Sequence, residues 1–316
     1  MKKRIAVLGA GGFIGRHIVS ALAASDWAAP VAAGHRRAVD NTTVVETLRL
    51  DATSPIELAS ALTGAYGVIN CVTGSSGTIV DGARALFGVT SRMSPPPRVI
   101  HFSSMVVYGA AIGTVDETAE LRGDLGPYSM AKVAAEALAW GHHNVVSLRP
   151  GCVYGGHSPQ WSERVARWLQ AFRLGDLGPA GDGICNLVHI DDVVEATLRA
   201  LRSPEAGGQA FNLAMSSPPT WNEYFIAYAR ALGAVPVRRI SQLRLQLEGK
   251  LLAPPLKIAE ILARKAHLRL PPPPVPPSLL RAFRQELLLD SRKAERVLAM
   301  QWTPLERGLT APKATV

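Results

Sequence analysis

Short, nearly continuous apolar runs alternate along the chain with stretches in which apolar residues recur at helical spacing. The runs cover residues 4–9, 30–34, 45–50, 68–72, 99–103 and 145–149. A strand that helices cover on both faces loses the alternation of apolar and polar positions and shows this continuous pattern. Strands and helices in regular alternation predict an α/β fold with a doubly wound parallel sheet, that is, a Rossmann sheet.

The alternation loosens after Pro150. Helices are predicted over 163–174, 192–201 and 221–232, and short strands over 184–189 and 209–214. Residues 271–277 are prolines except for one valine. They favour an extended bridge, because proline has no N–H group for a helix or an inner strand. We expect a first domain over 1–150 that also takes in parts of 184–215, and a smaller, mainly helical α/β portion over 151–316.

The composition is that of a soluble globular protein. Hydrophobic residues make up 47% and charged residues 19% of the 316 residues, which does not suit a protein with many membrane spans. The basic start of the chain is followed by an apolar run that glycines and Arg16 interrupt, so we do not interpret it as a secretory signal. Three widely spaced cysteines that form no metal-type pair predict reduced thiols, no metal site and a cytoplasmic protein: Cys71, Cys152 and Cys185.

The net charge of +9 is concentrated in one C-terminal segment. Residues 238–296 contain 13 Lys and Arg against 5 Asp and Glu, whereas residues 1–237 contain 19 of each class. Apolar and basic residues alternate at helical spacing in 241–252 and 256–270, which favours helices that cover a pocket and keep their charged ends in water. Peripheral contact with an anionic membrane surface is the alternative. Nucleic-acid binding is disfavoured, because the segment has almost no aromatic residues.

A glycine-rich turn, Gly9-Ala10-Gly11-Gly12-Phe13-Ile14-Gly15, stands between the first predicted strand and the first predicted helix. Glycine permits a tight turn and lets backbone N–H groups approach a phosphate at the start of the helix, where the helix dipole also favours negative charge. A glycine turn in this position predicts a site for a dinucleotide pyrophosphate. We therefore expect the domain over 1–150 to bind NAD(P).

The second predicted strand ends in the basic turn Gly34-His35-Arg36-Arg37. Folds that bind NAD usually have an Asp or Glu about 20 residues after the glycine turn, which bonds to the ribose 2′-hydroxyl. Two guanidinium groups can instead form charge-assisted hydrogen bonds to a 2′-phosphate, each worth about 1.5–3 kcal/mol. His35, Arg36 and Arg37 therefore predict NADP as the cofactor. If the turn is only a solvated basic loop near Asp40, NAD remains open.

Three residues carry candidate chemistry. Tyr128 and Lys132 are four residues apart, so a helix would place them on one face. The pKa of an unperturbed tyrosine is about 10, and we expect the charge of Lys132 to lower the pKa of Tyr128. Ser104 follows a predicted strand and can polarise a carbonyl while Tyr128 transfers the proton. Together they predict a catalytic site, although Ser104 alone would also suit a strand-end cap and Tyr128 the start of a helix.

The spacing of Gly9, Gly12 and Gly15 resembles that of the short-chain dehydrogenase/reductase superfamily, whose extended branch is the better match. That branch includes nucleotide-sugar epimerases, sugar dehydratases and ketone reductases. In its serine motif the active hydroxyl stands four residues before the tyrosine of a Tyr-Gly pair, and Ser104 stands four residues before Tyr108. Segments at 148–155, 181–193 and 290–305 also resemble the branch, so the likeness covers nearly the whole chain.

The resemblance implies further contacts with the cofactor. It implies that Lys132 also holds the nicotinamide ribose, that Asp51 contacts the adenine and that residues 148–155 lie along the nicotinamide. The cofactor-binding residues expected in addition to the glycines, the basic turn, Tyr128 and Lys132 are Phe13, Ile14, Asp51, Ala52, Val72, Thr73, Pro150 and Val153. Asp192 is predicted to cap a helix, and His189 is interpreted as structural rather than catalytic.

Two departures from the branch bear on the reaction. Dehydratases of the branch have an Asp-Glu pair directly after the active hydroxyl, where this chain has Met105 and Val106. Nucleotide-sugar enzymes commonly have an Arg before the late strand, where this chain has Cys185 and Asn186. An NADPH-dependent reductase of a small-molecule ketone or aldehyde is therefore favoured. A nucleotide-sugar epimerase is the alternative, and a non-enzymatic NADP-binding sensor or assembly factor is a third hypothesis. The resemblance leaves a homodimer open.

Overall fold

The computed structural model describes residues 1–34, 46–247 and 274–309, and the chain divides into two compact units. The first unit comprises Met1–Gly151, Val188–Ser216 and Leu289–Trp302. The second comprises Cys152–Leu187, Ser217–Leu288 and Thr303–Val316. Both units are thus built from segments that are separated in the sequence.

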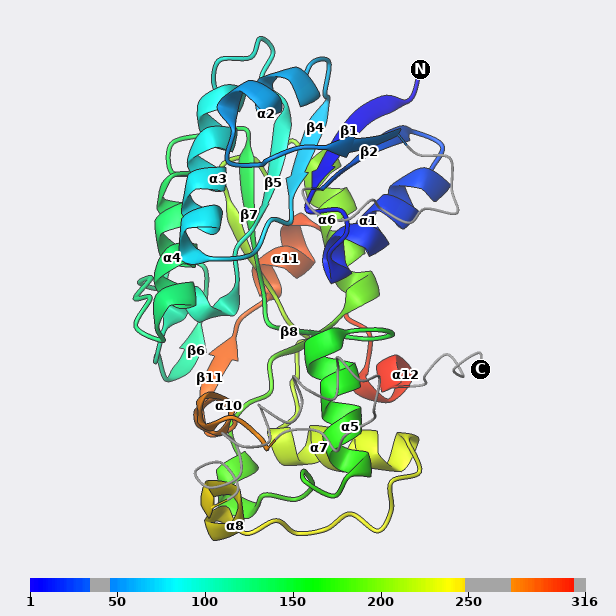
Figure 1. Cartoon of the computed structure of the whole chain (residues 1–316), viewed down its shortest axis with the longest axis vertical. Helices are drawn as coiled ribbons and strands as arrows, with labels where there is room; N and C mark the ends of the chain where they lie inside the picture. Colours follow the sequence, from blue (N-terminus) through cyan, green and yellow to red (C-terminus); the bar gives the residue numbers. More distant parts are fainter. Residues whose placement is uncertain (35–45, 248–273, 310–316) are drawn as a thin grey trace, which may run out of the picture. The chain divides into compact units, whose positions relative to one another are not determined.

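A seven-stranded sheet forms the centre of the first unit, with the strand order β10-β7-β5-β4-β1-β2-β3 (Figure 1). All six pairings between neighbouring strands are parallel. The prediction of a doubly wound parallel sheet is confirmed. The strand order reverses between β1 and β4, which is the point where such sheets bind ligands outside the carboxyl ends of the strands. The strands are β1 (Lys3–Leu8), β2 (Ala28–Gly34), β3 (Glu46–Arg49), β4 (Gly67–Asn70), β5 (Arg98–Phe102), β7 (Val145–Pro150) and β10 (Ala210–Leu213).

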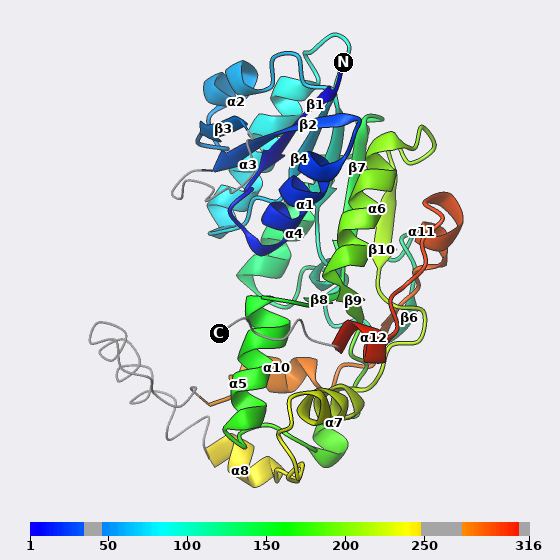
Figure 2. The same ribbon diagram turned by 90° about the vertical axis from the view of Figure 1, so that its right-hand side faces the viewer.

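Helices cover both faces of this sheet (Figures 1 and 2). On one face lie α1 (Phe13–Ala24) and α6 (Ile190–Arg202), and on the other lie α2 (Pro55–Ala61), α3 (Ser76–Thr90) and α4 (Pro127–Ala137). Every residue of β4 and of β7 is buried as a result. This double cover is the reason why the strands have continuous apolar sequences.

The prediction that Asp192 caps the helix after the late strand is wrong. Helix α6 begins at Ile190, and His189 is its N-cap, with Nδ1 accepting the backbone N–H of Asp191 at 3.3 Å. Short strand β9 (Leu187–His189) leads directly into the helix, so the helix starts two residues earlier than expected. Asp192 lies inside the first turn, where a carboxylate still interacts favourably with the helix dipole.

Residues from the end of the chain return to the first unit. Helix α11 (Arg292–Val297) lies in this unit, as do the 3₁₀ turn η1 (Met105–Tyr108) and strand β6 (Gly113–Val115). The backbone N–H of Asp290 donates to Val115 O at 2.9 Å, and Asn212 Nδ2 donates to Asp290 O at 3.1 Å. These bonds attach the late segment beside β10.

The second unit is mainly helical and has an aromatic core. Trp221 packs on Phe283 with ring centroids 4.7 Å apart, and Thr220 and Glu223 form a capping box at the start of α7. The predicted helix over 256–270 and the first three residues of the proline run, 271–273, lie outside the described residues. The elements of this unit are β8 (Cys152–Tyr154), η2 (Pro159–Glu163), α5 (Arg164–Gln170), η3 (Gly178–Gly181), α7 (Trp221–Ala231), α8 (Gln242–Leu247), α10 (Pro277–Ala282) and α12 (Leu305–Leu309), and short strand β11 (Leu287–Leu289) continues into the first unit.

Within the residues that the structure describes, no helix has the length and apolar character needed to cross a membrane.

Candidate active site

The glycine turn after β1 is packed too closely to accept side chains at two of its positions. Gly9 has φ +75°, and a Cβ atom there would lie 2.8 Å from Cys71 O. A Cβ atom on Gly15 would lie 2.4 Å from Gly9 O. Backbone bonds hold the turn, since the N–H groups of Gly9 and Ala10 donate to Ala33 O at 3.0 and 3.1 Å. The turn therefore requires glycine for its shape, as the sequence indicated.

The start of α1 is suited to an anion. Gly12 is the N-cap of this helix and provides no side-chain cap, and the first turn contains no acidic residue. Gly11 and Gly12 are exposed, while Phe13 and Ile14 are half-buried beside them. Backbone N–H groups and the helix dipole at this place, next to the reversal of the strand order, fit a dinucleotide pyrophosphate.

The structure brings Asp51 and Ala52 to the end of β2. The backbone N–H of Leu50 donates to Gly34 O at 3.1 Å, so the loop after β3 begins next to Gly34. Asp51 Oδ1 accepts both the N–H of Thr53 at 2.9 Å and its hydroxyl at 2.8 Å. The basic residues His35, Arg36 and Arg37 directly follow Gly34 but lie outside the described residues.

Sequence reasoning missed Arg49 at this end of the sheet. Arg49 is exposed, and it pairs in register with Gly34, the first residue of the basic turn. The sequence does not show this neighbourhood, because the register between β2 and β3 sets it. A further cation thus stands where the basic turn begins.

Val72 and Thr73 follow β4 at the same edge of the sheet. The N–H of Val72 is held by Asn70 Oδ1 at 3.1 Å, and Ser76 Oγ donates to Pro127 O at 3.2 Å. The loop after β4 is therefore tied to the start of α4. Pro150 ends β7 and is buried, whereas Val153 belongs to β8 in the second unit.

A side-chain hydrogen bond from α4 to η1 brings the helix that carries Tyr128 next to the turn that Ser104 caps. Ser104 is half-buried and caps η1, because its Oγ accepts the N–H of Val106 at 3.4 Å. Ser129 Oγ donates to Val106 O at 2.8 Å, which ties the first turn of α4 to η1. Tyr128 precedes Ser129 and is 45% exposed. Ser104 therefore does cap a turn, and the same turn places it beside the helix that carries Tyr128.

Lys132 is buried one turn further along α4. It is 3% exposed, and its Nζ donates to Phe102 O at 2.7 Å and lies 5.9 Å from the centroid of the Tyr128 ring. Burial lowers the pKa of Lys132 to about 8, although nearby Cys71 and Glu136 oppose this shift. Partial desolvation raises the pKa of Tyr128. We expected Lys132 to lower the pKa of Tyr128. In this arrangement of the two side chains the pKa of Tyr128 is raised instead.

The other titratable groups on the strand side of Lys132 are held neutral. Burial raises the pKa of the Cys71 thiol to about 12, and burial together with the Lys132 charge lowers the pKa of His101 to about 3. Glu136, four residues after Lys132, is a buried residue that the sequence reasoning missed. Its spacing from Lys132 was the available signal, since residues four apart on a helix are neighbours.

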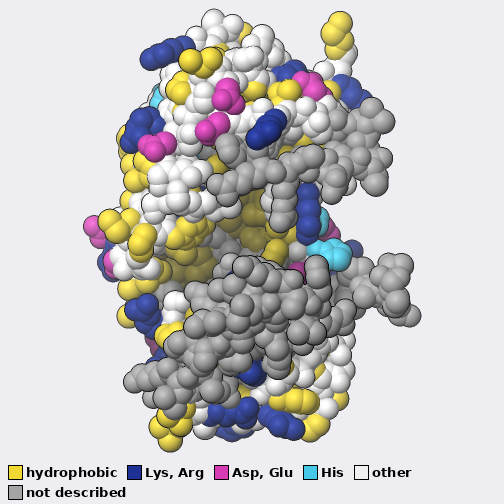
Figure 3. Space-filling view, viewed as in Figure 1, with side chains coloured by type: hydrophobic (Ala, Val, Ile, Leu, Met, Phe, Trp, Pro, Cys, Tyr) yellow, Lys and Arg dark blue, Asp and Glu magenta, His cyan; other side chains and the backbone are white. Residues whose placement is uncertain are grey.

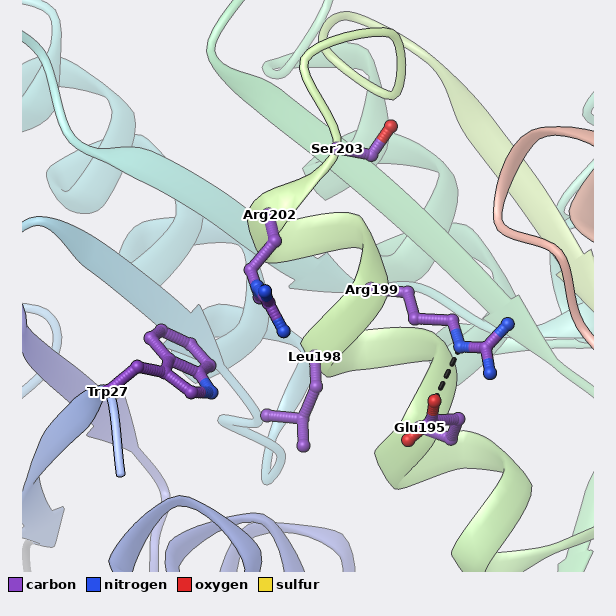
Figure 4. A pocket seen from close by; sticks show the side chains of 6 residues that line it. All are labelled: Trp27, Glu195, Leu198, Arg199, Arg202 and Ser203. Atoms are coloured by element: carbon purple, nitrogen blue, oxygen red, sulfur yellow. Dashed lines mark hydrogen bonds and ion pairs between the residues drawn. The ribbon is translucent and has the colours of Figure 1, made fainter. Parts of the chain in front are cut away.

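Two cavities in the first unit lie at the amino ends of the strands, at the edge opposite the glycine turn. One of about 360 Å³ contains Arg202, whose guanidinium lies 5.4 Å from the Trp27 ring (Figure 4). Arg199 on the same helix is paired with Glu195. The other cavity, of about 660 Å³, is lined by residues of the loops before β4, β5 and β7, including Tyr66, and by Arg98 at the start of β5. None of the residues lining these two cavities is a predicted site residue.

Lys and Arg side chains on the visible face of the first unit are interspersed with Asp and Glu side chains (Figure 3). This mixture agrees with the balanced charge of residues 1–237.

Solved structures share the fold of the chain. UDP-glucuronic acid 4-epimerase from Bacillus cereus, in complex with UDP-glucuronic acid and NAD, is 20% identical with a TM-score of 0.73, over 98% of this chain and 97% of that one. dTDP-glucose 4,6-dehydratase from Bacillus anthracis, in complex with NAD, is 16% identical with a TM-score of 0.73, over 98% and 94%.

Two further comparisons concern the sequence. Protein YeeZ from Escherichia coli strain K12 is 33% identical over 145 residues, which are 44% of this chain and 48% of YeeZ. The match therefore spans about half the length of this curated relative. The model of the NAD dependent epimerase/dehydratase family matches residues 5–214, well over half of the chain, and this range contains the glycine turn, Ser104, Tyr128 and Lys132. The chain belongs to the NAD-dependent epimerase/dehydratase family.

Proposed function

We propose that the protein is an NADPH-dependent reductase of a ketone or aldehyde in a small molecule. The observation that carries the proposal is the joint placement of the glycine turn, Ser104, Tyr128 and Lys132 at the carboxyl edge of one parallel sheet. The exposed backbone of Gly11 and Gly12 and the uncapped start of α1, which has no acidic residue in its first turn, suit the phosphates of a dinucleotide.

When bound, the cofactor supplies a hydride. In the proposed reaction Ser104 Oγ donates a hydrogen bond to the substrate carbonyl and stabilises the negative charge that develops on its oxygen. Tyr128 then gives its phenolic proton to that oxygen. A raised pKa keeps the Tyr128 phenol protonated at neutral pH, which suits a proton donor in a reduction. Lys132, as the family resemblance implies, would hold the nicotinamide ribose.

The proposed preference for NADPH rests on the charge at the end of β2. His35, Arg36 and Arg37 follow Gly34 in the sequence, and Arg49 stands opposite Gly34 in the sheet. These cations suit a 2′-phosphate, whereas an acidic residue at this place would repel it. The two neighbours named above were solved with NAD, so the preference needs a direct test.

A nucleotide-sugar epimerase is the second candidate, and the likeness to UDP-glucuronic acid 4-epimerase favours it. The same residues would serve this reaction, with Tyr128 moving a proton to and from a sugar hydroxyl. The two reactions differ in their net use of the cofactor. A reductase consumes NADPH, whereas an epimerase returns the hydride to the other face of the sugar.

The first test is a titration of the purified protein with NADPH and with NADH. We expect NADPH to bind more tightly, and the double variant Arg36→Ala/Arg37→Ala to lose that preference, while Arg92→Ala, which changes an exposed arginine after α3, keeps it. Equal affinity for both cofactors, or NAD retained through purification, would instead favour the epimerase.

The second test assigns the reaction. NADPH oxidation is followed with a panel of ketones and aldehydes, and conversion of UDP-sugars is followed by NMR. Turnover of a carbonyl compound with stoichiometric loss of NADPH supports the reductase, and sugar conversion without net loss supports the epimerase. Tight NADPH binding without either reaction would point to a non-enzymatic NADP-binding role.

A further inference from the structure

A buried ion pair between Glu136 and Arg149 stands behind the three proposed catalytic residues. The side chains of Glu136 and Arg149 are 7% and 6% exposed. Arg149 Nε donates to Glu136 Oε1 at 2.8 Å, and Nη2 donates to the same oxygen. The second carboxylate oxygen, Oε2, accepts the hydroxyl of Ser103 at 2.5 Å. Both oxygens of the carboxylate are therefore engaged by donors from β7 and from the end of β5.

Arg149 is itself held by further contacts. Its Nη1 donates to Tyr108 Oη at 2.7 Å and to Glu117 O at 3.1 Å. The Tyr108 hydroxyl in turn donates to Asn212 Oδ1 at 2.6 Å. The ion pair thus has little freedom to rearrange, because η1, β7 and β10 all contribute to the same buried network.

Two residues of this network are next to proposed catalytic residues. Ser103 directly precedes Ser104, and Glu136 lies one helical turn after Lys132 on α4. Lys132 Nζ donates to Phe102 O, and Glu136 accepts from Ser103. Two consecutive residues at the end of β5 are consequently bonded to two consecutive turns of α4.

On the basis of the proposed function, we infer that Glu136 is a positioning residue for the reaction. Its carboxylate, fixed by Arg149, ties the strand end that carries Ser104 to the helix that carries Tyr128 and Lys132. The distance between the carbonyl-polarising hydroxyl and the proton donor is therefore set by a side chain that contacts neither substrate nor cofactor. Small displacements of reacting groups are costly, and a shift of about 1 Å can lower a rate roughly 100-fold.

Glu136 also contributes charge. The groups that face Lys132 are Glu136 and Tyr128 on its own helix, Cys71 after β4, and His101 and Phe102 O on β5. Arg149 and Ser103 face Glu136 from β7 and β5. Burial lowers the pKa of Lys132, and Cys71 and then Glu136 oppose this shift. Glu136 is the carboxylate among these groups, and its charge favours the protonated form of the lysine.

The inference is tested with Glu136→Gln and Ser103→Ala in the full chain. The matched controls are Glu195→Gln, which removes a paired carboxylate from α6, and Ser147→Ala, which removes a buried hydroxyl from β7. Turnover is measured with NADPH and the best carbonyl compound of the panel. The Lys132 pKa is measured by NMR of ¹³C-labelled lysine, with the Lys132 signal assigned by its loss in Lys132→Met.

We expect Glu136→Gln to lower kcat roughly 10- to 100-fold, to change KM for NADPH less than threefold, and to lower the measured Lys132 pKa. Ser103→Ala should lower kcat about tenfold and leave the Lys132 pKa unchanged, because the carboxylate is still present. Both controls should match the wild type in kcat and in the Lys132 pKa.

Glu136→Gln leaves Arg149 without a counter-charge, so this variant alone can fail to fold. The double variant Glu136→Gln/Arg149→Met removes both charges, and we expect it to fold and still to have a low kcat. Wild-type kcat in Glu136→Gln, in Ser103→Ala or in the double variant would overturn the inference. If the wild type reduces no carbonyl compound, the proposed function fails. In that case the inference is tested by the Lys132 pKa, measured in the wild type and in Glu136→Gln. Equal pKa values in the two proteins would overturn the inference.

Discussion

Replacing Lys132 with methionine should stabilise the folded protein while it abolishes activity. Lys132 is 3% exposed, and burial lowers its pKa from 10.5 to about 8. The folded protein therefore binds this proton less tightly than the unfolded chain does. Below about pH 8 the lysine is charged in both states, and the burial of that charge reduces the free energy of unfolding.

The size of the effect follows from this shift. One pKa unit corresponds to about 1.4 kcal/mol, so a change from 10.5 to about 8 corresponds to roughly 3 kcal/mol. Methionine cannot make the hydrogen bond from Nζ to Phe102 O, which is worth about 1 kcal/mol. We expect Lys132→Met to raise the free energy of unfolding by about 2 kcal/mol at neutral pH.

The pH dependence has a definite sign. Between pH 8 and 10.5 the folded wild type has released the proton while the unfolded chain still holds it, so the free energy of unfolding of the wild type rises with pH. Methionine does not titrate. The difference in the free energy of unfolding between Lys132→Met and the wild type should therefore be largest below about pH 8 and decrease as the pH rises towards 10.5.

Urea unfolding of the wild type and Lys132→Met, followed by fluorescence at a series of pH values, measures this difference. Lys2→Met is the matched control, because Lys2 Nζ also donates to a backbone oxygen, Ser25 O at 2.8 Å, but from an exposed position. The control should show no comparable gain. A Lys132→Met protein that is less stable than the wild type at neutral pH, or a difference that does not vary with pH, would refute the reasoning.

Three further changes test separate parts of the site and fold. Gly15→Ala should abolish tight NADPH binding in calorimetric titrations, because its Cβ would lie 2.4 Å from Gly9 O, whereas Gly88→Ala, with nothing within 4 Å of its Cβ, should bind normally. Tyr128→Phe should keep the fold and lose about 10²- to 10⁴-fold in turnover, and unchanged turnover would exclude the proton-transfer role. Ser75→Ala should lower the free energy of unfolding by about 1 kcal/mol in urea titrations, since Ser75 caps α3, and a smaller loss than in Ser91→Ala, at the other end of the helix, would contradict this.

Local sequence patterns were sufficient for the elements of the first unit. The strand prediction over 145–149 corresponds to β7 at Val145–Pro150, and the helix predicted directly after the glycine turn corresponds to α1 at Phe13–Ala24. These elements depend on the burial of neighbouring residues and on the conformational freedom of glycine, both of which a short stretch of sequence reveals. The start of α6 was misplaced because a histidine side chain replaced the expected carboxylate as the cap.

The sequence by itself determined the class of fold, the need for glycine in the turn after β1, and the three residues proposed for catalysis, because each depends on residue types at short spacings. Only the tertiary structure decided that Arg49 stands opposite Gly34, that residues 289–302 return to the first unit, and that Glu136 joins Ser103 to Arg149. These relations depend on strand register and on contacts between residues far apart in the chain. The pKa shifts of Lys132 and Tyr128 belong with them, because desolvation is a property of the packed core rather than of any local sequence.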